Sequence, residues 1–203
     1  MVSLTGILHA NSLEKFWKTN FRSMEQFYDD VSTGSLPDYA FVEPRMIFNH
    51  NDMHPPFGAF RESEFEGQPV YDNAVSDVRA GEALLHSVYS AIRDSRSQSG
   101  SNAANTALLI TFDEHGGTYD HVPPPSAVPP TRDGAPGEMG FTFDRLGCRV
   151  PAIRLGGYTQ GGSIIHVEMQ HGWLIAPLNR IGDVQGSVHD PATNTDTTPD
   201  GFK

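Results

Sequence analysis

The sequence predicts an α/β fold whose central sheet has mainly parallel strands. Amphipathic helical patterns alternate along the chain with short apolar runs, and that alternation is typical of layered α/β domains. The 203 residues are enough for one domain with a sizeable core, and 12 phenylalanines are available to fill it. The 20 glycines and 15 prolines indicate many loops, but the composition is not that of a disordered chain.

The first half of the chain is expected to form two helices around a short strand. Residues 12–32 form the first helix, because apolar and aromatic side chains recur on one face at helical spacing. Asn11 and Glu14 fit a capping box at its start, and Gly34 fits its end. The next predicted elements are a strand over 39–42, a loop over 48–67, a second helix over 73–95 and a turn over 95–106.

The second half is expected to contribute three strands, a long loop and one helix. The predicted elements are a strand over 107–112, a loop or lid over 122–140, a strand over 150–155, a glycine-rich turn over 156–162, a strand over 163–167 and a helix over 168–181. We therefore assign residues 1–181 to one domain and residues 182–203 to a loose polar tail.

The net charge of −11 limits the classes of partner. It argues against nucleic acid and against an anionic membrane surface, because both attract basic patches. An anionic phosphate substrate stays open, because a bound divalent cation reverses the local sign of the potential. No stretch has the length and apolarity of a transmembrane helix, and the first residues do not resemble a signal peptide, so the localisation is left open. The single cysteine, Cys148, excludes an internal disulfide and is expected to be a buried, inert thiol.

The most informative segment directly follows the predicted strand over 107–112. Between Asp113 and Pro125 the chain carries three carboxylates, two histidines and a tyrosine around a pair of glycines, and it ends in three prolines. The glycines allow a sharp turn, and the prolines make a stiff, extended exit. Adjacent carboxylates at the end of a strand suit a divalent cation. The alternative is that they only cap a loop.

Three blocks of the sequence resemble the bacterial and fungal phosphoesterase family, which includes phospholipases C and related acid phosphatases. The run from Asp113 to Pro125 resembles its most specific signature. The segments from Phe41 to Arg45 and from Asn51 to Pro56 resemble its upstream blocks, and the segment from Leu146 to Ile153 resembles its downstream strand. The blocks occur in the family's order.

The resemblance implies an alkaline-phosphatase-like layered fold and a hydrolase acting on phosphate-ester or phospholipid substrates. It implies a divalent metal ion of unknown identity, held by Asp113, Glu114 and His115. His54 and His121 are the catalytic residues that it implies, at the substrate phosphate. Within the same segment, the adjacent carboxylate of Asp120 is expected to orient an imidazole.

Two further side chains are given structural roles. Arg149 precedes a predicted strand and is expected to brace the fold through an ion pair. His171 lies near a predicted helix start, where members of the superfamily often keep another histidine. The local match is poor, so surface or structural use is expected.

The resemblance also implies that the chain starts in the middle of its domain. Family members carry an N-terminal Glu-Asn-Arg-Ser-Phe-Asp-His-type block that this chain lacks, so the missing N-terminal half of the same domain is an expected partner. The Ser or Thr nucleophile of the superfamily belongs to that part. Thr111 and Thr118 lie near the cluster but not in a nucleophile-like context, and no nucleophile is nominated.

Two other functions stay open from the sequence. The first is a non-catalytic fragment or pseudoenzyme that keeps the fold and part of a metal site. The second is a metal-free hydrolase with Asp113 and Glu114 as acid and base, which the histidine-rich surroundings make the weakest of the three.

Overall fold

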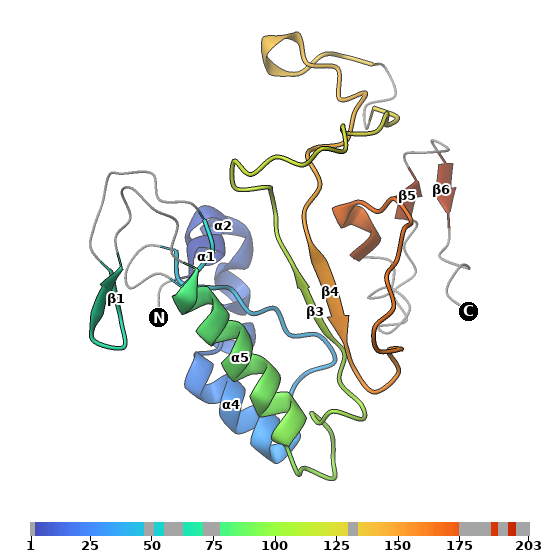
Figure 1. The fold of residues 1–203 in the computed structure, drawn as a ribbon. Helices are drawn as coiled ribbons and strands as arrows, with labels where there is room; N and C mark the ends of the chain where they lie inside the picture. Colours follow the sequence, from blue (N-terminus) through green and yellow to red (C-terminus); the bar gives the residue numbers. More distant parts are fainter. Residues whose placement is uncertain are drawn as a thin grey trace. The chain divides into compact units, whose positions relative to one another are not determined.

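The computed structural model describes residues 3–46, 51–54, 63–70, 78–129, 134–174, 188–190 and 195–197. Its elements are the helices α1 (Leu4–Leu8), α2 (Ala10–Leu13), α3 (Trp17–Asn20), α4 (Met24–Thr33) and α5 (Arg79–Asp94), the 3-10 helices η1 (Glu14–Phe16), η2 (Glu138–Gly140) and η3 (His171–Leu174), and the strands β1 (Ser63–Phe65), β2 (Gln68–Val70), β3 (Leu108–Thr111), β4 (Ala152–Leu155), β5 (Val188–Asp190) and β6 (Thr195–Thr197). Figure 1 shows them along the chain. The architecture therefore mixes helices and strands, as the sequence predicts. Among the described helices, none has the length and apolarity needed to cross a membrane.

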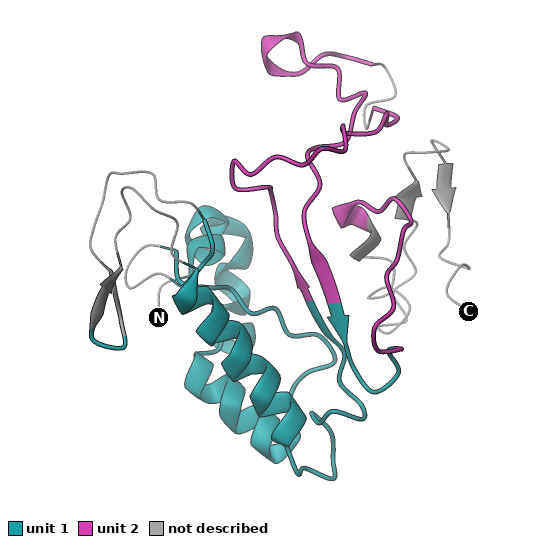
Figure 2. Ribbon diagram, in the orientation of Figure 1, with its two compact units in different colours: residues 1–109, 154–159 teal, residues 110–153, 160–203 magenta. Residues whose placement is uncertain are grey.

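The chain divides into two compact units (Figure 2). The first consists of residues 1–109 and 154–159, and the second of residues 110–153 and 160–203. The helices α1 to α5 belong to the first unit, and the predicted Asp-Glu-His cluster belongs to the second.

The core of the first unit lies between α4 and α5. Phe27 and Val31 on α4 are buried together with Val88 and Ile92 on α5. The two helices lie side by side in Figure 1. The predicted helix over 73–95 is confirmed for residues 79–94, and residues 71–77 lie outside the described part. Burial of such side chains supplies most of the stability of an amphipathic helix.

The helix predicted over 12–32 is interrupted. Phe21 has extended backbone angles, and Ser23 is the N-cap of α4. In its capping box, Gln26 N donates to Ser23 Oγ and Ser23 N donates to Gln26 Oε1. The capping box predicted at Asn11 is wrong, because Asn11 lies inside α2, whose N-cap is His9. The capping box is at Ser23 instead, where it satisfies N–H groups of the first turn of α4 that have no partner within the helix. Gly34 ends the helix as predicted, with φ of 76°.

The region predicted as a strand over 39–42 has no regular structure. It is anchored instead by Glu43, whose Oε1 accepts from Leu4 N at 2.7 Å and whose Oε2 accepts from the Ser3 hydroxyl at 2.9 Å. A carboxylate at a helix start satisfies N–H groups that have no partner within the helix. The side chain therefore joins two parts of the chain that are far apart in sequence.

The strands among the described residues form three separate pairs. β1 and β2 are antiparallel, as are β5 and β6, while β3 pairs with β4, and these two arrows run in opposite directions in Figure 1. The strands predicted over 107–112 and 150–155 are confirmed, while the described residues 163–167 form no strand. The described pairings thus include no parallel central sheet, and the layered phosphatase-like fold stays a prediction.

The C-terminal part is described in segments. Of the helix predicted over 168–181, the described residues form only η3, and residues 175–181 lie outside the description. β5 and β6 lie within the segment predicted as a polar tail.

Candidate functional site

The Asp-Glu-His cluster lies in a turn directly after β3. Gly116 and Gly117 have φ of 61° and 76°, in the left-handed region that side chains other than glycine rarely adopt. Thr118 N donates to His115 O at 3.0 Å and closes the turn. The paired glycines therefore do what the sequence predicts: they reverse the chain where the strand ends.

Glu114 holds this turn. Its Oε2 accepts from Gly116 N at 2.7 Å and lies 3.2 Å from His115 Nδ1. The His115 ring also meets Tyr119 edge-to-face, with centroids 5.2 Å apart. Glu114 and His115 are thus brought together, and one carboxylate oxygen already has a backbone donor.

Asp113 is exposed. Carboxylate and imidazole groups are suitable donors for a divalent cation. In the part of the chain that the structure describes, however, no three His, Cys, Asp or Glu side chains gather as a metal site. Metal ligation by Asp113, Glu114 and His115 stays a prediction.

Asp120 is the centre of the best-defined polar network of this segment. Its Oδ2 accepts from Arg149, with Nε at 2.6 Å and Nη2 also in contact. Its Oδ1 accepts from Val122 N at 3.1 Å and lies 2.9 Å from His121 Nδ1. These contacts hold the pKa of the Asp120 carboxyl below its usual range, first through the Val122 N–H and then through Arg149 and His121.

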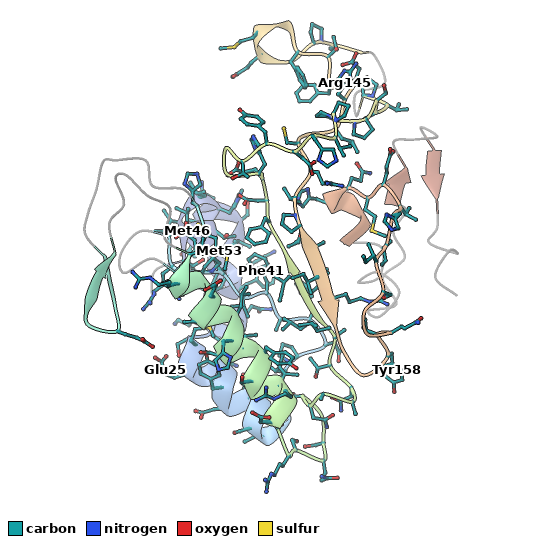
Figure 3. All side chains as sticks on the ribbon, in the orientation of Figure 1. Glu25, Phe41, Met46, Met53, Arg145 and Tyr158 are labelled. Atoms are coloured by element: carbon teal, nitrogen blue, oxygen red, sulfur yellow. The ribbon has the colours of Figure 1, made fainter. Side chains whose placement is uncertain are left out.

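Arg149 reaches Asp120 because two segments run antiparallel beside each other. Ala127 N donates to Asp144 O at 2.8 Å, and Leu146 N donates to Pro125 O at 3.0 Å. Ser126 and Arg145 form an antiparallel bridge, and Figure 3 labels Arg145 there. The proline exit of the motif therefore pairs with the segment that carries Arg149. The sequence predicts an ion pair for Arg149 but does not indicate its partner, which the structure shows to be Asp120.

His171 has a specific contact that the sequence did not indicate. Its Nε2 lies 2.6 Å from Phe112 O, one residue before Asp113. The expected structural role fits this contact. No local sequence pattern around His171 predicts a contact with a residue 59 positions earlier in the chain.

His54 lies in the other unit. Asn51 ties its loop to Arg45: Asn51 N donates to Arg45 O at 2.9 Å, and Arg45 N donates to Asn51 Oδ1 at 2.7 Å. Met53 packs against Gly81 of α5, where an added Cβ would lie 2.7 Å from Met53 Cγ; Figure 3 labels Met53. His54 itself is exposed. Its catalytic role stays a prediction.

Comparison with known proteins gives one family and several relatives. The sequence model of the Phosphoesterase family matches residues 7–185. Non-specific phospholipase C1 of Arabidopsis thaliana is 37% identical over 177 residues, which are 79% of this chain and 29% of that protein. Non-specific phospholipase C6 of the same plant is 36% identical, over 69% of this chain and 24% of that protein. Phospholipase C A of Mycobacterium tuberculosis is 30% identical, over 71% of this chain and 25% of that protein. The chain spans less than a third of the length of each of these relatives.

Proposed function

Because this chain belongs to the Phosphoesterase family, we propose that it provides part of the active site of a hydrolase that cleaves phosphate esters of phospholipids. The observation that carries the proposal is the turn after β3, where Glu114, His115, Asp120 and His121 lie within one short segment. The relatives' names, which are those of phospholipases C, support the phospholipid substrate class.

The chain's own residues are proposed to bind and orient the substrate phosphate. The His121 side chain is 89% exposed, so its ring is accessible to a bound group. Its Nδ1 lies 2.9 Å from Asp120 Oδ1. His54 is proposed to donate to the phosphate from the loop after Arg45. Hydrogen-bond donors placed where negative charge develops lower the barrier to phosphoryl transfer.

A divalent cation is proposed at Asp113, Glu114 and His115. When bound, such an ion neutralises phosphate charge and polarises a phosphate oxygen. Its support here is the chemistry of the donors, two carboxylates and an imidazole at a strand end.

The nucleophile is proposed to lie outside this chain. The Thr111 hydroxyl donates to Pro151 O at 3.3 Å, so the structure gives it a role in joining the two strand ends. A hydroxyl that acts as nucleophile instead needs an adjacent base or metal.

A chimera tests the proposal. Residues 7–185 replace the matching segment of Arabidopsis non-specific phospholipase C1, and hydrolysis of p-nitrophenylphosphorylcholine and p-nitrophenyl phosphate is measured with and without divalent metal. We expect metal-dependent turnover in the chimera and none from residues 1–203 alone. Asp113→Asn, His121→Ala and His54→Ala should each reduce turnover by at least about 100-fold.

His166→Ala is the matched control, because His166 is an exposed histidine with no proposed role. It should leave turnover unchanged. Turnover by residues 1–203 alone would show that the chain contains its own nucleophile. A folded chimera without turnover would instead favour the alternative, a non-catalytic chain that keeps the fold and part of a metal site.

A further inference from the structure

We propose that Asp120 and Arg149 are positioning residues that hold His121 with its proton on Nδ1, so that the Nε2 lone pair can accept a hydrogen bond from a hydroxyl group at the bound phosphate. The inference deepens the proposed function and rests on it for the role of His121. It assigns a purpose to Arg149, whose sequence position indicated only an ion pair.

The two oxygens of Asp120 have different partners. Arg149 Nε and Nη2 contact Oδ2, whereas Val122 N and His121 Nδ1 contact Oδ1. A carboxylate oxygen only accepts hydrogen bonds, so a proton on the ring nitrogen 2.9 Å away is favoured over a lone pair there. In the neutral ring the proton is then on Nδ1, and Nε2 is the acceptor.

Arg149 fixes the orientation of the carboxylate. Its contacts to Oδ2 oppose rotation of the carboxylate, because rotation would break charge-assisted hydrogen bonds. The Asp120 side chain is 23% exposed and that of His121 is 89% exposed. The carboxylate is thus the more sheltered partner, and the ring projects into solvent, where a ligand can reach Nε2.

The tautomer is measurable in the 203-residue chain. Long-range proton–nitrogen NMR spectra of the nitrogen-15-labelled protein distinguish Nδ1–H from Nε2–H in each ring, at about two pH units above the ordinary histidine pKa of about 6.5. His121→Gln identifies the signals of His121, and the exposed His9 is the internal reference. We expect a larger Nδ1–H fraction at His121 than at His9. An equal fraction, or predominant Nε2–H at His121, would overturn the proposal.

Asp120→Asn is the sharpest variant. In Asp120→Asn the amide has a single oxygen for two sets of donors, Arg149 and Val122 N, and the negative charge beside His121 Nδ1 is lost in either orientation. The Nδ1–H fraction at His121 should therefore fall toward that of His9. Asp144→Asn is the control, since Asp144 lies on the neighbouring segment, and it should leave the tautomer unchanged.

Arg149→Gln tests the second positioning residue. We expect the Nδ1–H fraction at His121 to fall toward that of His9, and Arg149→Lys to restore part of it. Backbone amide spectra that match the wild type show that the fold is kept. If folded Asp120→Asn and Arg149→Gln variants both keep the wild-type tautomer, the network is only a surface ion pair of small energy. This readout does not depend on turnover, so it can fail while the phosphoesterase proposal holds, and the reverse.

Discussion

The imidazole of His171 lies against the backbone carbonyl of Phe112, with Nε2 2.6 Å from the oxygen. Because a carbonyl only accepts, Nε2 is protonated. The contact joins η3 to the end of β3, one residue before Asp113. It therefore restrains the backbone from which the predicted metal ligands project.

Removing this contact should loosen the end of β3. For His171→Ala we expect amide exchange at Asp113 and Glu114 to rise about fivefold, because one hydrogen bond contributes about 1 kcal/mol. Hydrogen exchange followed by NMR measures the change, and His166→Ala is the control. Equal exchange in the wild type and His171→Ala would show that the contact does not restrain the strand end.

The elements that the sequence predicts well are those with a local cause. α5 has a clear apolar face, and β3 is a short apolar run before a polar turn, so pattern alone identifies both. The prediction of one helix over 12–32 missed the break before α4, because the apolar periodicity continues across Ser23. Only the capping residues at Ser23 and Gln26 mark the start of a new helix. Residues 39–42 read as a strand from apolarity alone, yet Tyr39 and Phe41 are exposed.

Gly34 should be the most sensitive of the left-handed glycines in the first unit. In Gly34→Ala the new Cβ would meet Ser97 Oγ and lie 2.6 Å from Ser99 Oγ, at φ of 76°. Gly67 has φ of 73° with nothing within 4 Å, so Gly67→Ala carries the backbone strain without the clash. We expect Gly34→Ala to lower the free energy of unfolding by about 2–4 kcal/mol, and Gly67→Ala by about 1–2 kcal/mol at most.

Urea unfolding followed by circular dichroism measures both changes. Combining Gly34→Ala with Ser97→Ala should recover part of the loss, because the nearest obstructing atom is removed. Similar losses in Gly34→Ala and Gly67→Ala would show that the neighbouring serines move aside without cost.

The pKa of Asp120 should respond to Arg149. A carboxyl whose pKa is depressed in the folded state contributes stability above the unfolded pKa of about 3.9, and this contribution is lost as the pH falls through the folded pKa. Arg149→Gln should raise the pKa of Asp120 while leaving it below the unfolded value, because the Val122 N–H is the larger cause. The carboxyl carbon-13 shift against pH measures this.

Arg145→Gln is the control for this titration, since Arg145 donates to Pro124 O, at 3.2 Å. It should not move the pKa of Asp120. If Arg149→Gln also leaves that pKa in place, the ion pair is too solvated to matter.

The site is predictable from sequence where its residues are neighbours in the chain. Glu114, His115 and the paired glycines form the expected turn through contacts between near neighbours in the chain, one and two positions apart. The contacts of Asp120 with Arg149 and of Phe112 with His171, across 29 and 59 positions, depend on the pairing of distant segments, which no local pattern encodes. His54 belongs to the other unit, and no group of three potential metal ligands is found among the described residues, so the roles of His54 and of the predicted metal ligands stay predictions.

Metal binding at the turn after β3 is tested by removing its charges without changing its shape. We expect the wild-type chain to bind a divalent cation such as Zn²⁺ or Mn²⁺, and Asp113→Asn with Glu114→Gln to lose at least about 10-fold in affinity, because anionic oxygens are replaced by neutral amides. Calorimetry and elemental analysis after dialysis measure this. Asp144→Asn with Glu138→Gln makes the same change in charge at exposed residues of the same unit and should bind as the wild type does. Equal metal content in all three proteins would show that Asp113 and Glu114 are not metal ligands. Equal losses of affinity in the two double variants would show that only the net charge of the protein matters.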